Sequence, residues 1–153
     1  MNEYEFEKIS VTDVANKAGV GRATFYRYFK RKEDVIVYYF EHNRKSFEYK
    51  QRFYERCRED YLKTITDVLT LFQKNKDPFK LIRRARLEYL YLDYLNKYFS
   101  LHFRENHSER GKYSPYLFAG MLFNVSMAWL DGDCTDPTSS IAQAMINVLF
   151  PTA

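Results

Sequence analysis

The stretch from Ile9 to Asp34 constrains the fold most, because it predicts two short helices joined by a tight turn. Ser10 is a suitable N-cap, and Asp13 lies in the first turn, where the helix dipole favours an acid. Apolar residues then recur at helical spacing, and Gly19 can supply the positive φ that ends the helix. We expect Val20 to be a buried plug between the two helices.

The second helix is predicted from about Arg22 to Phe29 and is too short and too polar to be stable alone. Ala23, Phe25 and Phe29 form its predicted core side. Cationic and hydroxyl side chains face the other way, as a helix that enters the major groove of DNA requires. The predicted DNA-contacting residues of the turn and this helix are Gly21, Arg22, Thr24, Tyr26, Arg27 and Tyr28.

The formal net charge of +4 gives no general argument for a nucleic-acid partner, but the distribution of charge does. Seven cations and only one acid lie between Lys8 and Lys32. A local basic patch on a helix-turn-helix is the electrostatic footprint of a DNA-binding unit. The weaker alternative is a solvated helix face that binds nothing.

The same stretch resembles the helix-turn-helix of TetR-type (TetR/AcrR) transcriptional regulators, without a gap over about 26 residues. The resemblance implies that Thr24 and Tyr26 contact DNA and that Lys32, which opens the next helix, holds a phosphate. We expect Thr12 to hold a flanking phosphate as well. The residues that carry the resemblance are Ile9, Val11, Asp13-Val14-Ala15, Ala18-Gly19-Val20, Thr24-Phe25-Tyr26, Tyr28-Phe29 and Lys32-Glu33-Asp34.

TetR-type DNA-binding domains are three-helix units, in which an earlier helix packs across the helix-turn-helix. Only the tail of such a helix could precede Ile9, so we expect either a true start upstream of Met1 or a shortened member that lacks most of the first helix. Beyond residue 45 the resemblance is one of architecture, apart from a loose likeness of residues 116–132 to the dimerising helix of some members.

The rest of the chain predicts helices and no strands, so the expected fold is all-α. A DNA-binding domain over residues 1–45 and a helical effector-binding and dimerisation domain over residues 46–153 are expected. Asp77 and Ser114 are the expected N-caps of two helices, because a proline follows each of them. Helices are predicted from Lys32 through Phe47, from Tyr61 to Phe72, from Phe79 to Phe103 with a break near Leu87, from Tyr113 to Leu130 and from Thr138 to Phe150.

The last two predicted helices carry apolar stripes that we expect to pair with each other. Their combined apolar surface is large for a monomer, so a second copy of the chain is the expected partner. An internal core pair is the weaker alternative. The predicted dimer interface consists of Leu117, Met121, Val125, Ala128, Ile141, Met145, Val148 and Leu149.

Aromatic residues make up 18% of the chain, and several lie on predicted helices of the second domain. They could line a pocket for an apolar or cationic small molecule, although each single aromatic is more often part of a core. Asn124 is a polar residue inside an apolar helix, and it needs a hydrogen bond from a ligand, across a dimer, or from the nearby backbone. The predicted pocket residues are Phe72, Tyr89, Tyr94, Phe99, Phe118 and Asn124.

Other functional classes find little support in the sequence. The three histidines have no metal-ligand spacing, and no nucleophile motif or phosphate-binding glycine loop occurs, so we expect no enzyme, metal or cofactor. Two cysteines without a CxxC spacing, and no leader at the start, suit a reducing cytoplasm. The most apolar run, residues 116–130, is too short to span a membrane.

These observations predict a cytoplasmic, homodimeric regulator that binds double-stranded DNA at a palindromic operator. Repression, with release by an unidentified small-molecule effector, follows from the family resemblance. The alternative is a truncated dimerisation module that no longer binds DNA. The short segment before Ile9 is the reason to consider it.

Overall fold

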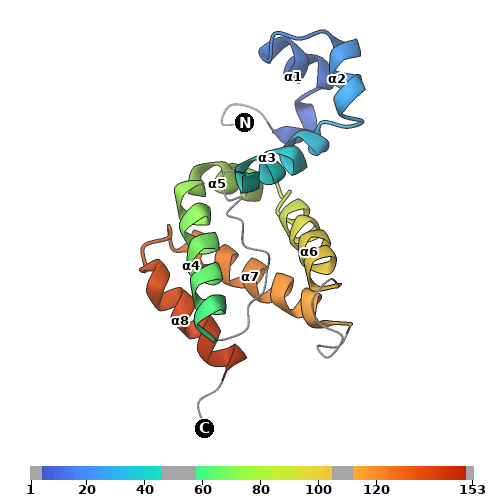
Figure 1. Cartoon of the computed structure of the whole chain (residues 1–153). Coiled ribbons are helices and arrows are strands. Elements are labelled where there is room, and N and C mark those ends of the chain that lie inside the picture. Colours follow the sequence, from blue (N-terminus) through green and yellow to red (C-terminus); the bar gives the residue numbers. More distant parts are fainter. Residues whose placement is uncertain (1–4, 46–57, 105–111, 151–153) are drawn as a thin grey trace.

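The computed structural model describes residues 5–45, 58–104 and 112–150, and within these residues every regular element is a helix (Figure 1). The all-α prediction is confirmed. A 3-10 turn η1 (Phe6–Lys8) precedes α1 (Val11–Lys17), α2 (Arg22–Tyr28), α3 (Glu33–Lys45), α4 (Arg58–Lys74), α5 (Lys76–Arg84), α6 (Tyr89–Arg104), α7 (Ser114–Asp131) and α8 (Thr138–Leu149).

The helices form two groups joined by α3 (Figure 1). Residues 5–32, with η1, α1 and α2, lie at one end and are called the helix-turn-helix unit. Helices α4 to α8 form the other group, called the helical body. Within the body, α4 packs along α8 and α6 packs along α7, while α3 contacts α6.

The core of the helical body is rich in aromatic side chains. On α4, Tyr61, Ile65, Leu69 and Phe72 are buried at the three- and four-residue spacing of one helix face. The Phe72 ring lies with its centroid 4.3 Å from that of Phe79 on α5. The apolar periodicity of the sequence predicts Ile65, Leu69 and Phe72 in this face, but it also predicts Leu62, which is half-buried, where the structure buries Tyr61.

Two predicted helix starts are wrong by one or two residues. Helix α5 begins at Lys76 after Asn75, so that Asp77 lies in its first turn and is not its N-cap. Helix α7 begins at Ser114, with Tyr113 at the N-cap position. Proline is tolerated anywhere in a first helical turn, so it locates the turn without fixing the capping residue.

The predicted pairing of the last two helices is also wrong within one chain. The principal partner of α7 is α6, and that of α8 is α4. Periodicity identifies which face of a helix is apolar but not which helix covers it. The predicted break near Leu87 is confirmed, because α5 ends at Arg84 and α6 begins at Tyr89. The predicted extension of α3 to Phe47 lies outside the described residues.

Candidate nucleic-acid interface and ligand cleft

The start of α1 is fixed by a reciprocal capping box. The Ser10 hydroxyl oxygen accepts a hydrogen bond from the Asp13 backbone N–H at 3.1 Å, and the Asp13 carboxylate accepts one from the Ser10 N–H at 2.8 Å. The Asp13 carboxylate also accepts from the Ser10 hydroxyl at 2.6 Å. These hydrogen bonds lower the pKa of Asp13, the Ser10 hydroxyl contributing most. The predicted cap is confirmed.

The turn between α1 and α2 has the geometry of a Schellman motif. Gly19 adopts φ +69°, and the Val20 N–H donates to the Ala15 carbonyl at 3.0 Å. The prediction that Val20 is a buried plug is wrong, because its side chain is 38% exposed. Ala23, expected on the core side of α2, is exposed as well. Among the described residues of this unit, only Ala15 and Phe25 are buried.

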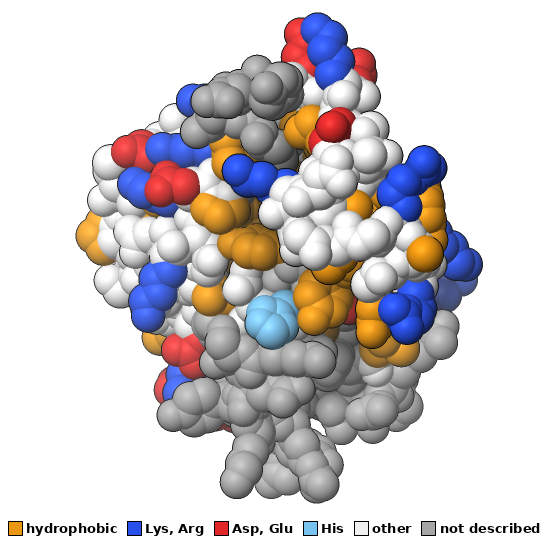
Figure 2. Space-filling model, turned by 90° about the horizontal axis from the view of Figure 1, so that it is seen from above, with side chains coloured by type: hydrophobic (Ala, Val, Ile, Leu, Met, Phe, Trp, Pro, Cys, Tyr) orange, Lys and Arg blue, Asp and Glu red, His pale blue; other side chains and the backbone are white. Residues whose placement is uncertain are grey.

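Helix α2 presents a mixed basic and aromatic face. Phe25 is buried and its ring contacts those of Tyr26 and Phe29, with centroid distances of 5.6 and 5.4 Å. Tyr26 and Tyr28 are 49% and 72% exposed. Of the other predicted contact residues, Thr12, Gly21, Arg22 and Arg27 are exposed and Thr24 is half-buried. Figure 2, seen from this end, shows Lys and Arg side chains along one edge with hydrophobic side chains between them.

Asp34 organises the corner between α2 and α3. Its Oδ2 atom accepts hydrogen bonds from the backbone N–H groups of Lys30 at 2.8 Å and Arg31 at 2.9 Å. The Arg31 guanidinium lies 3.6 Å from the same carboxylate. The hydrogen bond from the Arg31 N–H is the main reason that the pKa of Asp34 is lowered.

Lys32 points back onto the segment before α1. Its Nζ atom donates to the carbonyl oxygens of Phe6 at 2.6 Å, Ile9 at 2.8 Å and Glu7 at 3.3 Å. The same ammonium lies 4.3 Å from the centroid of the Phe6 ring. The family resemblance places this residue on a phosphate, whereas here its donors are directed at the protein backbone.

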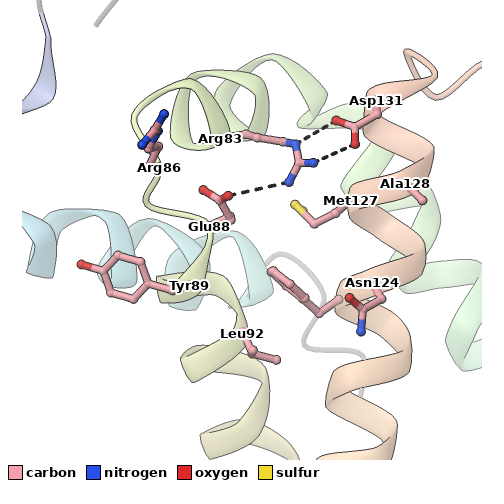
Figure 3. Close-up of a pocket in the computed structure, with 10 residues that line it drawn as sticks. Arg83, Arg86, Glu88, Tyr89, Leu92, Asn124, Met127, Ala128 and Asp131 are labelled. Carbon is pink, nitrogen blue, oxygen red and sulfur yellow. Dashed lines mark hydrogen bonds and ion pairs between the residues drawn. The ribbon is translucent and has the colours of Figure 1, made fainter.

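The predicted pocket residues separate into two sets. Phe72 and Phe99 are buried, and Tyr94 and Phe118 pack against the same core. Tyr89 and Asn124 instead line an open cleft of about 610 Å³ between the α5–α6 corner and α7 (Figure 3). Asn124 satisfies its amide on the nearby backbone, because Nδ2 donates to the Gly120 carbonyl at 2.8 Å.

The cleft holds a charge cluster that the sequence did not reveal. The Arg83 guanidinium donates to Asp131 through Nε at 2.8 Å and through Nη2 at 2.7 Å. Its Nη1 atom lies 3.7 Å from Glu88 (Figure 3). The other Glu88 oxygen, Oε2, is buried without a hydrogen-bond partner. Arg83 and Asp131 are 48 residues apart in the sequence, so no local spacing could indicate this cluster. The other cleft-lining residues are Arg86, Leu92, Phe123, Met127 and Ala128.

A row of aromatic contacts connects the cleft to α3. Phe123 lines the cleft, and its ring centroid lies 6.3 Å from that of Tyr91. The Tyr91 ring lies 5.3 Å from Phe40, which is buried on α3. Burial is the main cause that raises the pKa of the Tyr91 hydroxyl.

The predicted interface residues differ in exposure. Leu117 on α7 and Val148 on α8 are 72% and 77% exposed, and Ala128 is exposed as well. Met145 is buried within the chain and therefore faces its core. The remaining predicted residues, Met121, Val125, Ile141 and Leu149, are half-buried.

In the described parts of the chain, no group of three His, Cys, Asp or Glu side chains could hold a metal ion. Among the same residues, no helix is long and apolar enough to cross a bilayer.

Residues 1–39 match the family model described as "Bacterial regulatory proteins, tetR family". The matched residues include the helix-turn-helix unit and the first half of α3. No curated protein and no solved structure gives a significant match to the chain.

Proposed function

We propose that the chain is a cytoplasmic repressor of the TetR type, which binds a palindromic operator as a homodimer and is released by a small-molecule effector. The match of residues 1–39 to the tetR family model supports this proposal. The observation that carries the proposal is the coincidence of the family match with an exposed basic and aromatic face on α2. Such a face supplies both phosphate contacts and base-edge contacts in a major groove.

DNA binding is tested by fluorescence anisotropy on the DNA that flanks the gene, across a salt series. We expect tight binding to one palindromic segment that weakens steeply with salt. Tyr26→Ala should weaken binding to operator and to other DNA alike. Tyr113→Ala, which removes an exposed tyrosine from the helical body, is the control. Equal, weak binding to every DNA would instead favour the truncated dimerisation module.

Dimerisation through α7 and α8 is supported by the exposed leucine and valine on these two helices. Sedimentation of the full chain measures the oligomeric state. Leu117→Glu and Val148→Glu should each convert the dimer to a monomer, because a carboxylate would be buried unpaired at the interface. Leu101→Glu changes an exposed leucine on α6 and should leave the dimer intact. A dimer that survives both interface changes would contradict the proposed interface.

The open cleft is the proposed effector site, because Phe123 on its wall connects through Tyr91 to α3. A side chain that fills the cleft should act as a permanent occupant. Leu92→Trp, on the cleft wall, is expected to lower operator affinity without changing the oligomeric state. The control is Asp93→Trp, which introduces the same side chain at the adjacent, exposed position. Equal affinities for the two variants would exclude the cleft as the effector site.

A further inference from the structure

The Lys32 ammonium has no donor left for another partner. A lysine ammonium carries three N–H donors, and the carbonyls of Phe6, Glu7 and Ile9 accept from it. The Phe6 ring adds a cation–π contact on the same atom. A phosphate could reach this ammonium only if at least one carbonyl were released.

These hydrogen bonds connect distant parts of the helix-turn-helix unit. Phe6 and Glu7 belong to η1, Ile9 directly precedes the Ser10 cap of α1, and Lys32 directly precedes α3. The bonds therefore tie the entry of α1 to the entry of α3 across 23 to 26 residues. Because few side chains in this unit are buried, such a link has a large share in setting the position of α1.

We propose that Lys32 is a positioning residue, which holds the Phe6–Ile9 segment against the start of α3 and makes no phosphate contact of its own. The consequence for DNA binding rests on the proposed function. Neutralisation of phosphates then falls to exposed cations such as Arg22, Arg27 and Lys30. Lys32 sets the geometry in which these cations meet DNA.

The first test needs no DNA. The free protein is acetylated with a limiting amine reagent, and the modification of each lysine is followed by mass spectrometry. Lys32 should react about tenfold more slowly than the exposed Lys30 and Lys17, because its hydrogen bonds must open first. Equal rates for the three lysines would overturn the proposal. This result stands whether or not the protein binds DNA.

The second test separates positioning from phosphate contact through the salt dependence of operator binding. Lys30→Met is expected to reduce the slope of log K against log salt by about one phosphate equivalent. Lys32→Met should lower affinity but leave that slope unchanged. A slope reduced by Lys32→Met as much as by Lys30→Met would identify a phosphate contact and contradict the proposal.

A conservative variant covers the case in which Lys32→Met does not fold. Lys32→Arg keeps the charge, but a planar guanidinium cannot direct three donors from one atom at converging carbonyls. The proposal predicts that Lys32→Arg loses operator affinity, although its salt slope stays that of the unchanged protein. Retained affinity would show that only the charge matters, as for a phosphate contact, and would overturn the positioning role.

Discussion

The helical body buries a continuous aromatic and aliphatic core, whereas the helix-turn-helix unit buries only Ala15 and Phe25 among its described residues. In and next to the helix-turn-helix unit, polar contacts compensate for the small buried core. They are the capping box at Ser10, the carboxylate of Asp34 and the ammonium of Lys32. The body therefore depends on packing, and the helix-turn-helix unit depends on hydrogen bonds. Single polar substitutions should affect the two regions very differently.

The largest expected effect is a loss of core packing in the helical body. Phe72→Ala should lower the free energy of unfolding by about 3–5 kcal/mol, because the ring is buried against Phe79 and Trp129. Chemical denaturation measures this change in the free energy of unfolding. Tyr113→Ala, at an exposed site, should cost less than about 0.5 kcal/mol. Similar costs for the two variants would mean that the body is not organised by this core.

A second prediction compares the same backbone conformation in the two regions. Gly19 and Arg86 both follow a helix with positive φ, at +69° and +56°. Gly19→Ala should cost about 1 kcal/mol of stability, since the added methyl meets no atom but the conformation disfavours it. Arg86→Gly should instead stabilise the body by up to about 1 kcal/mol. Destabilisation by Arg86→Gly, seen in the same denaturation curves, would show that its side chain makes a contact that outweighs the strain.

The capping box predicts a smaller and local effect. Ser10→Ala should destabilise α1 by about 1 kcal/mol, because the Asp13 N–H loses its acceptor. Amide hydrogen exchange should speed up across α1 and stay unchanged in α4. Ser10→Thr keeps a hydroxyl and is the matched control. Faster exchange in α4 would contradict the independence of the two regions.

The pH dependence of the α2–α3 corner is the most local prediction. The pKa of Asp34 is lowered from the ordinary 3.8, so its contribution is complete above that value and is lost as the pH falls through the folded pKa. The amide resonances of Lys30 and Arg31 should therefore shift together in acid, below the ordinary carboxyl range. In Asp34→Asn this titration should disappear. A titration that persists in the asparagine variant would have to come from another group.

The sequence predicts the helices of both regions well, since capping residues and apolar periodicity are local signals. Ser10, Gly19 and the α4 stripe are examples. Prediction from the sequence fails where the position of a side chain depends on residues that are distant in the chain. No local pattern could direct Lys32 to the carbonyls of η1, or separate Phe72 in the core from Tyr89 at the cleft.

Phe40 is the point at which α3 is fixed to the helical body, so the residues of α3 before it form a rigid arm that carries the helix-turn-helix unit. The helix is held in the body by the rings of Phe79, Tyr91 and Tyr94 around Phe40, seven residues after its first residue, Glu33. At about 1.5 Å per residue this arm is about 10 Å long, so a tilt of about 10° moves its far end by about 2 Å. In the proposed dimer both arms move, while successive major grooves lie about 34 Å apart. A tilt that barely disturbs the core would thus decide whether two recognition helices engage DNA together.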